Sequence, residues 1–309
     1  MNRPGYRGRF APSPSGPLHF GSLAAAIGSY LEARFHNGVW LLRMEDLDAP
    51  RTVAGAADDI LRTLEACGLY WDETIIYQSQ RTAAYEDALR ELQRIGAVYP
   101  CACTRREIAD SALHGIDGPV YPGACRNGLP EGREGRTWRV RTDNHAIAFD
   151  DALQGHQLQH LESEIGDFVV KRADGLFAYQ LAVVVDDAFQ NISHVVRGAD
   201  LLASTPRQIH LQRLLGLPTP RYMHLPVAVN KAGEKLSKQT LAAPVDKNNP
   251  TAALWRALAF LQQSPPPELQ WEKPEIVLEW AARNWHNDKL QGVAAILPDS
   301  GAVPQSLIS

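Results

Sequence analysis

The sequence is poor in cysteine, in excess positive charge and in long apolar runs. Its four cysteines among 309 residues are too few for a disulfide scaffold. Its 31 lysines and arginines stand against 35 acidic residues, whereas a protein that coats nucleic acid non-specifically needs a strong basic excess. No apolar run approaches the roughly 20 residues of a membrane span. We therefore expect neither a secreted disulfide-rich domain, nor a general nucleic-acid coat, nor a membrane protein.

The N-terminal region bears on localisation. Three arginines precede the alanine-rich stretch Leu23–Leu31, an order that superficially resembles a secretory signal peptide. Three prolines and His19 interrupt the segment, so we expect no export and a cytoplasmic protein. With 45% apolar and 21% charged residues the chain can bury enough surface to fold, and its length predicts two or three domains.

Strands alternate with helices in the N-terminal third. Short apolar segments predict strands at Tyr6–Ala11 and Gly38–Leu42. Apolar residues at helical spacing predict helices after Gly21, over Ala54–Cys67 and over Ala83–Ile95. This alternation predicts an α/β fold with a parallel sheet.

Later segments are less regular. Asp167–Val170 and Leu176–Val185 flank the turn sequence Ala173–Gly175, and we expect a β-hairpin there. A strand is expected at His224–Val229, with Pro226 placing it at a sheet edge or making its first residues irregular. Further helices are expected from Ser204 onward, over Ala252–Leu261 and over Pro274–Trp285.

Residues 99–142 break this pattern, with three cysteines, many glycines and prolines, and little periodicity. They predict an inserted module that something other than an apolar core holds together. Cys101 and Cys103, with Cys125 after 21 intervening residues, have a spacing found in zinc sites. Three thiolates need a fourth ligand, and coordination chemistry alone favours His114 over a phenol. The run of arginines in this stretch is either a binding surface for a polyanion or simply a solvated surface.

Two segments far apart in the chain have features of a nucleotide site. The segment around His19 and Gly21 joins a strand to a helix N-terminus, where backbone N–H groups and the helix dipole favour an anion. Taken alone, this segment is explained better as a proline-rich connecting turn. Lys235 and Lys238 lie on a polar loop more than two hundred residues later, and lysine suits the phosphates of a nucleotide. The pair is more specific than either segment alone.

Together these segments resemble the two nucleotide-binding signatures of class I aminoacyl-tRNA synthetases, here His19–Ser22 and Lys235–Gln239. The longer motifs that resemble the catalytic domain of glutamyl-tRNA synthetases are Arg9–His19, Leu42–Asp48, Tyr179–Asp187 and Val196–Leu202. The resemblance covers residues from about 7 to 240. Within that group the chain looks most like the family of glutamyl-queuosine tRNA(Asp) synthetases, which are shortened paralogues.

The resemblance implies a class I Rossmann nucleotide-binding fold with an inserted zinc-containing module and a short C-terminal helical region. The expected parts are 1–98, the first half of the Rossmann domain; 99–190, the insertion with a zinc element and a β-hairpin; 191–240, the second half; and 241–309, the helical region without an anticodon-binding domain. The 70 residues after Gln239 are too few for the large anticodon-binding region of full glutamyl-tRNA synthetases. This count favours the shortened family.

Chemistry and resemblance together select an amino-acid pocket. Glutamate offers two carboxylates and one ammonium, and arginine forks bind carboxylates through paired hydrogen bonds. The resemblance places Arg9 and Arg197 in this pocket, and Glu45 would take the α-ammonium. The resemblance adds Tyr179, whose hydroxyl would donate to a carboxylate, and two residues of the first motif, Ala11 and Ser13.

The resemblance also implies the residues that bind the nucleotide and the metal. The implied nucleotide-binding residues are His19, Gly21, Ser22, Lys235, Ser237 and Lys238. His19 and Lys238 would be catalytic, because they would stabilise charge that builds on the phosphates, and magnesium would accompany ATP. The implied zinc ligands are Cys101, Cys103, Tyr121 and Cys125. Tyr121 rather than His114 would then complete one structural zinc per chain.

The expected activity is ATP-dependent activation of L-glutamate to glutamyl-adenylate without tRNA, followed by transfer to the queuosine base of tRNA(Asp). The expected partners are ATP, L-glutamate and this tRNA, with no membrane, and a monomer is expected. Two alternatives remain: a truncated glutamyl-tRNA synthetase that charges a tRNA 3′ end, and a catalytically silent tRNA-binding regulatory paralogue. Asp186 and Asp187 are expected to be structural rather than a metal or acid–base pair.

Overall fold

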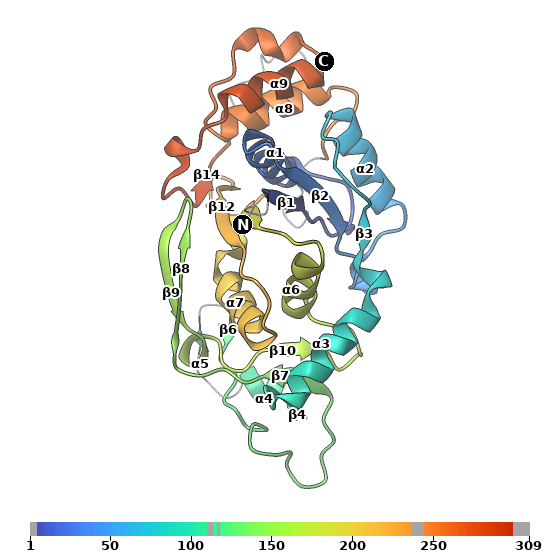
Figure 1. Ribbon diagram of the computed structural model, residues 1–309, viewed down its shortest axis with the longest axis vertical. Helices are drawn as coiled ribbons and strands as arrows, with labels where there is room; N and C mark the ends of the chain where they lie inside the picture. The colour runs from blue at the N-terminus through green and yellow to red at the C-terminus, as the bar shows by residue number, and fades with distance from the viewer. Residues whose placement is uncertain (1–4, 110–113, 116–117, 237–243, 299–309) are drawn as a thin grey trace.

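The computed structural model describes residues 5–109, 114–115, 118–236 and 244–298 (Figure 1). The helices are α1 (Phe20–Phe35), α2 (Ala56–Ala66), α3 (Thr82–Arg94), α4 (Arg105–Ala109), α5 (Leu161–Glu164), α6 (Tyr179–Phe189), α7 (Thr205–Leu214), α8 (Pro250–Phe260) and α9 (Pro274–Asn284). The strands are β1 (Arg7–Phe10), β2 (Val39–Met44), β3 (Ile76–Tyr77), β4 (Val98–Cys101), β5 (His114–Gly115), β6 (Gly118–Pro119), β7 (Thr137–Val140), β8 (Ala146–Asp151), β9 (Gly155–His160), β10 (Val169–Lys171), β11 (His194–Gly198), β12 (Arg221–Leu225), β13 (Val227–Ala228) and β14 (Ala295–Ile296). Among the helices of these ranges, none has the length and apolar character needed to cross a bilayer.

Two parallel strand pairs form the centre of the molecule. β1 pairs with β2 around the connecting helix α1, and β11 pairs with β12 around α7. The N–H group of Ser193, just before β11, donates to the carbonyl of Arg7 at 3.0 Å, so the two pairs lie side by side. Strands joined by helices in this way confirm the predicted α/β fold.

Helix α1 is buried on most of its surface because its sequence is apolar or small on nearly every side. Leu23, Ile27 and Leu31 have no exposed surface, and α8 and α9 cover the side of α1 that faces away from the sheet (Figure 1). Gly28 permits a close approach, since a Cβ atom there would lie 2.5 Å from a methyl group of Leu225. This packing holds the N-terminus of α1 at the ends of the parallel strands.

Two expectations about secondary structure hold only in part. Asp167–Val170 and Leu176–Val185 are expected to form a hairpin, and an antiparallel bridge between Lys171 and Phe177 does close the turn, but the second strand ends there because Tyr179–Phe189 forms α6. A short run of buried apolar residues has no periodicity that separates strand from helix, and α6 is buried against its neighbours on several sides. Pro226 interrupts the expected strand between β12 and β13, in agreement with the irregular alternative, whereas the edge alternative is wrong because β12 lies between β11 and β8. A longer β-hairpin, β8–β9, precedes both segments in the chain.

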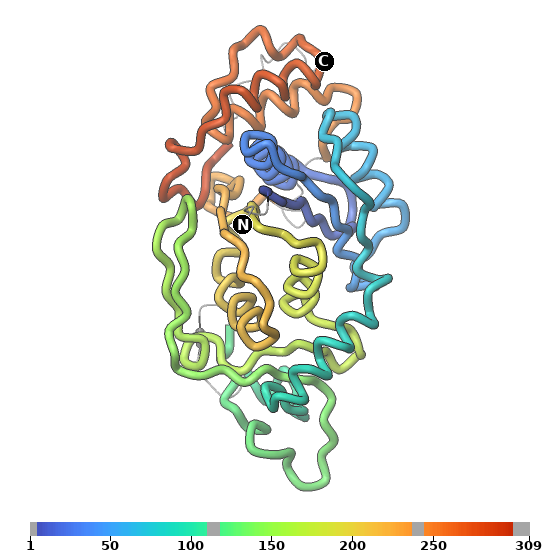
Figure 2. The backbone as a smooth tube through the Cα atoms, viewed as in Figure 1, coloured from blue at the N-terminus to red at the C-terminus, as the bar shows by residue number. Residues whose placement is uncertain are grey.

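The part of the inserted segment from β4 to β7 lies at the end of the molecule opposite α8 and α9, and the chain between β6 and β7 extends farthest from them (Figures 1 and 2). Its own core cluster is small and consists of Tyr99, Cys101, Ala102, Tyr121 and Cys125. A larger cluster contains Val98, Val140, Val183 and Val195, which lie on both sides of the expected boundaries at 98/99 and 190/191. The rest of the insertion therefore shares a core with the centre of the molecule.

Candidate active site

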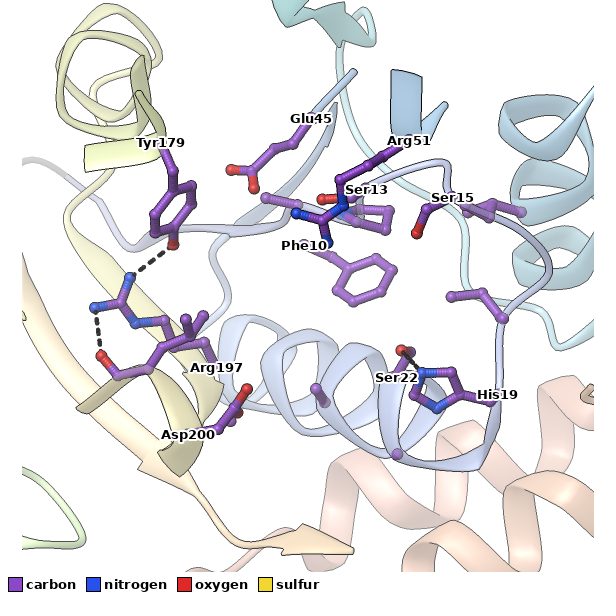
Figure 3. A pocket seen from close by; sticks show the side chains of 18 of the residues that line it. Phe10, Ser13, Ser15, His19, Ser22, Glu45, Arg51, Tyr179, Arg197 and Asp200 are labelled. Atoms are coloured by element: carbon purple, nitrogen blue, oxygen red, sulfur yellow. Dashed lines mark hydrogen bonds between the residues drawn. The ribbon is translucent and has the colours of Figure 1, made fainter. Parts of the chain in front are cut away.

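The carboxyl ends of β1, β2 and β11 meet at one edge of the central strands, beside the N-terminus of α1. A cavity of about 1220 Å³ opens there. In open α/β sheets, ligands bind at such an edge, where parallel strands end and helices begin. Figure 3 shows Glu45 and Ser13 on one wall of the cavity, Tyr179 and Arg197 on another, and His19 with Ser22 at a third side.

The two distant segments of the predicted nucleotide site lie together at this cavity. A Cβ atom at Gly21 would lie 3.7 Å from the carbonyl oxygen of Leu236. The N–H group of Val245 donates to the carbonyl of Leu18 at 2.9 Å, so the chain after the lysine loop returns to the same place. Lys235 lines the cavity and forms an ion pair with Asp200. Ser237 and Lys238 lie outside the described residues.

His19 precedes α1 and lines the cavity near Gly21 and Ser22. The hydroxyl of Ser22 lies 3.2 Å from Nε2 of His19, which holds the imidazole over the first turn of the helix. The side chain of His19 makes no capping hydrogen bond to the helix. An imidazole beside the positive end of a helix dipole is suited to an anionic ligand.

Arg9 faces the cavity from β1 and is 3% exposed. Its Nε and Nη2 atoms donate to the Asp187 carboxylate at 3.1 and 3.5 Å. The fully buried Arg43 donates to the same carboxylate at 2.8 Å and to the side-chain oxygen of Gln190 at 2.7 Å. Burial alone would raise the pKa of Asp187, but Arg9 and Arg43 hold it below its usual value.

Glu45 follows β2 and lines the cavity wall, with its side chain 10% exposed and its Oε1 atom buried. Its Oε1 atom accepts no hydrogen bond from a described residue and lies 3.6 Å from a guanidinium nitrogen of Arg43. Burial raises the pKa of Glu45, although Arg43 and Arg9 oppose this rise. A buried carboxylate with a free acceptor is suited to an ammonium ligand. Ala11 and Ser13 line the same cavity.

Arg197, at the end of β11, is 5% exposed and is held on several sides. Nη1 donates to the Tyr179 hydroxyl at 3.3 Å, and Nη2 donates to the Thr205 hydroxyl at 2.9 Å. Nε donates to Nε2 of His224 at 3.0 Å. The structure thus places all the described members of the predicted glutamate set around one cavity.

Asp186 and Asp187 point to different partners. Asp187 joins the two arginines described above, whereas Asp186 accepts hydrogen bonds from Gln78, Arg81 and Tyr85 at 2.8, 2.6 and 2.7 Å. Each carboxylate accepts three hydrogen bonds from described residues. Their geometry agrees with the expected structural role and not with a metal or acid–base pair.

The three cysteines of the insertion form a cluster whose sulfur atoms lie within 4.8 Å of one another. The Tyr121 hydroxyl lies 3.3 Å from Sγ of Cys101 and 3.7 Å from Sγ of Cys103. Zinc–sulfur bonds of about 2.3 Å in a tetrahedron separate two sulfurs by about 3.8 Å, and Cys103 and Cys125 are 3.6 Å apart. The cluster could therefore hold a metal ion. His114 lies in β5, and its side chain is outside the described residues.

Hydrogen bonding favours a thiolate at Cys101, whereas burial raises the pKa of Cys103 to about 11. Burial opposes ionisation of Cys101, but hydrogen bonds with Tyr121, the Cys103 backbone and Arg139 lower the pKa of Cys101 to about 7. The Nε atom of Arg139 lies 3.3 Å from the Cys101 sulfur. A thiolate is the form of cysteine that binds metals.

Several arginines of the insertion are engaged by the protein itself. Arg126 pairs with Asp167 at 3.0 Å, and Arg133 pairs with Glu107 at 2.8 Å. Arg139 is 8% exposed, with its guanidinium 3.9 Å from the ring of Tyr121. These pairings reduce the positive charge that this face presents to solvent.

Four residues that lie behind the cavity wall and contact its lining residues, directly or through one another, were not named from the sequence: Arg43, Asp151, Thr205 and His224. Arg43 lies inside the Leu42–Asp48 motif, and its place in that motif could have identified it as a candidate. The other three approach Arg197 through contacts between separate strands and helices, which no local pattern predicts.

Comparison with known proteins first identifies the class of protein. Residues 6–261 match the family model of the class I tRNA synthetase catalytic domain, glutamate and glutamine type. A glutamate tRNA ligase from Elizabethkingia meningosepticum superposes with a TM-score of 0.77 at 24% identity, over 94% of this chain and 67% of that one, so the fold is shared.

Two curated relatives are named glutamyl-Q tRNA(Asp) synthetase. That of Dechloromonas aromatica is 60% identical over 299 residues, covering 96% of this chain and 99% of the relative. That of Chromobacterium violaceum is 56% identical over 293 residues, covering 95% and 98%. The chain belongs to the glutamyl-Q tRNA(Asp) synthetase family and is an enzyme.

Proposed function

We propose that the protein activates L-glutamate with ATP, without tRNA, and transfers it to the queuosine base of tRNA(Asp). The observation that carries this proposal is the cavity, where the guanidinium groups of Arg9 and Arg197, the carboxylate of Glu45 and the N-terminus of α1 face the same space. A glutamate binds at one side of this space and a nucleotide triphosphate at the other. Adjacent binding of two reactants is the main requirement of adenylate formation.

The amino-acid side of the cavity complements the charges of glutamate. Arg197 and Arg9 bind carboxylate groups through guanidinium N–H donors, and Tyr179 donates its hydroxyl. Glu45 accepts the α-ammonium, which supplies the hydrogen bonds that its Oε1 atom lacks. Ala11 and Ser13 complete the contact with the substrate backbone.

The nucleotide side supplies electrostatic stabilisation. An oxygen of the glutamate α-carboxylate attacks the α-phosphorus of ATP, the bond to the bridging oxygen breaks, and pyrophosphate leaves with its electron pair. His19, the N–H groups at Gly21 and Ser22, and the loop residues Lys235, Ser237 and Lys238 stabilise the charge on the phosphates. Magnesium bound with ATP neutralises further phosphate charge. No nucleophile of the protein takes part.

In the second step, a hydroxyl oxygen of the queuosine cyclopentenediol attacks the carbonyl carbon of the adenylate. AMP leaves and the hydroxyl proton is released. The support for this acceptor is the family to which the chain belongs, since no residue contact on the cavity wall specifies it.

Labelled glutamate tests the acceptor. Transfer to tRNA(Asp) that contains queuosine, and not to the same tRNA without it or to tRNA(Glu), supports the proposal. Transfer to the 3′ end of tRNA(Glu) would instead support a truncated glutamyl-tRNA synthetase. Absence of glutamate-dependent pyrophosphate exchange would support the regulatory alternative.

We also propose one structural zinc ion per chain, bound by Cys101, Cys103, Tyr121 and Cys125. With four protein ligands it would have no open position for catalysis. Metal analysis of purified protein should find about one zinc per chain, and Cys101→Ser should lose it. A zinc-free wild-type protein would exclude this site, and retention by Tyr121→Phe but not by His114→Ala would make His114 the fourth ligand.

A further inference from the structure

A chain of buried side chains runs from Arg197 away from the cavity. Nε of Arg197 donates to Nε2 of His224 at 3.0 Å, and Nδ1 of His224 lies 2.6 Å from Oδ2 of Asp151. The side chains of His224 and Asp151 have no exposed surface. Neither residue lines the cavity, so neither can touch a ligand there.

Asp151 is itself held in one orientation. It ends β8, and its Oδ1 atom accepts the N–H groups of Leu153 and Gln154 at 3.0 and 2.9 Å and that of His224 at 3.1 Å. Its other oxygen is thereby directed at the imidazole. The carboxylate connects the β8–β9 hairpin to the strand that carries His224.

The chemistry of the three groups determines where the protons lie. A guanidinium group donates and never accepts, so Nε2 of His224 must be an unprotonated acceptor. The imidazole is therefore neutral and carries its proton on Nδ1, from which it donates to Asp151. Burial lowers the pKa of His224, although Asp151 opposes this, and the neutral form is favoured.

We propose that Asp151 and His224 are positioning residues that orient Arg197 toward the amino-acid substrate by selecting one tautomer of the imidazole. This inference rests on the proposed function, because it takes Arg197 as a ligand of a glutamate carboxylate. His224 and Thr205 engage Nε and Nη2, which fixes the plane of the guanidinium and leaves Nη1 beside Tyr179 at the cavity (Figure 3).

Asp151→Asn tests the tautomer. The amide has nearly the size of the carboxylate, but it presents an NH₂ group to Nδ1 and moves the imidazole proton to Nε2, where it opposes the N–H group of Arg197. We expect the KM for glutamate in pyrophosphate exchange to rise about tenfold or more. The KM for ATP should change by less than about twofold, because the nucleotide side of the cavity is untouched.

His224→Gln provides the matched background. Its amide oxygen can accept from Arg197 without help from Asp151, so adding Asp151→Asn should raise the KM for glutamate by less than about twofold. An equal effect of Asp151→Asn in both backgrounds would overturn the inference. A second pair of variants, His224→Asn and His224→Gln, tests the inference even if Asp151→Asn does not fold. His224→Asn retains only the donor toward Asp151, so the inference requires a higher KM for glutamate in His224→Asn than in His224→Gln.

Two further variants separate the possible failures. Arg197→Ala with the wild-type KM for glutamate would overturn the proposed function together with this inference, whereas a raised KM in Arg197→Ala and none in Asp151→Asn would overturn this inference alone. Glu32→Gln is the structural control, since its buried carboxylate accepts from Trp285 at 2.6 Å and lies outside the cavity. It should lower the Tm and leave both KM values unchanged.

Discussion

Two buried arginines that face the same cavity are held by opposite means. Arg9 donates to the carboxylate of Asp187, which also accepts from Arg43. Arg197, in the part of the chain that the structure describes, donates only to neutral groups: an imidazole, two hydroxyls and a backbone carbonyl. One cation is neutralised by direct contact, and the other is only oriented.

Because of this difference, the two arginines should contribute to different properties, Arg9 to stability and Arg197 to ligand binding. An arginine paired with a buried carboxylate stabilises the fold, and the loss of one partner leaves an uncompensated buried charge. An arginine held by neutral acceptors keeps its attraction for an anion from outside. We therefore expect changes around Arg9 to appear mainly in the free energy of unfolding and changes around Arg197 mainly in the KM for glutamate.

The largest expected effect is that of Asp187→Asn on stability. It removes the charge shared by two buried guanidinium groups, and urea unfolding should show a loss of about 3 to 5 kcal/mol. Glu73→Gln is the control. Glu73 pairs at 2.7 Å with Arg7, which begins the strand that also holds Arg9, but the Glu73 side chain is 52% exposed. That pair should contribute about 1 kcal/mol or less. Equal losses in the two variants would contradict the comparison.

The pH dependence of stability gives a second readout of Asp187→Asn. Because the pKa of Asp187 is lowered in the folded protein, its contribution is complete above the unfolded pKa of about 3.9 and is lost as the pH falls through the folded pKa. The wild type should therefore lose stability more steeply than Asp187→Asn below about pH 4. Parallel profiles would show that the carboxylate does not titrate against the arginines.

Changes on the nucleotide side of the cavity should affect mainly kcat, rather than the free energy of unfolding or the KM for glutamate. His19→Ala removes a donor near the phosphates and should lower kcat in pyrophosphate exchange about 100-fold. The free energy of unfolding should change by no more than about 1.5 kcal/mol, because the imidazole contacts the Ser22 hydroxyl of α1 but makes no capping hydrogen bond to the backbone of the helix. Lys238→Ala should behave alike. Normal exchange by both variants would show that the nucleotide site lies elsewhere.

The predictable part of the molecule is the part with local patterns. The helices α1, α2 and α3 have apolar residues at helical spacing, and the predicted ends match within a few residues. Arg9, Glu45 and Arg197 stand in long motifs, so they could be named as candidates before their positions in space were known. Helix α6 was missed because its central apolar run has the composition of a buried strand.

The network behind each arginine could not be predicted in this way. Asp151 and His224 are 73 residues apart, and they meet only because β8 lies beside β12. Arg9 and Asp187 are 178 residues apart, and they meet because Asp187 of α6 reaches both Arg9 of β1 and Arg43 of β2. Contacts of this kind depend on the arrangement of whole elements, and one sequence contains no local signal for them.

Arg197→Lys sharpens the comparison at the amino-acid side. It keeps the charge but loses the planar fork and the Nε donor to His224, so the KM for glutamate should rise about tenfold or more. Arg9→Lys can keep an ion pair with Asp187 and should raise this KM less while lowering stability more. Steady-state exchange and urea unfolding on both variants measure the two quantities, and the reverse order in either quantity would contradict the assignment.

The smallest expected effect is that of Tyr179→Phe, and it tests whether the ligands of Arg197 act on substrate binding one by one. The hydroxyl accepts from Nη1 of Arg197 at 3.3 Å, and its loss should cost about 0.5 to 1.5 kcal/mol, or roughly a two- to twelvefold higher KM for glutamate. Tyr85→Phe removes a matched hydroxyl that donates to Asp186 at 2.7 Å outside the cavity. It should lower the Tm and leave this KM unchanged. A raised KM in both variants would mean that any weakening of the core disturbs the pocket, and the separation between a neutralised and an oriented arginine would then not hold.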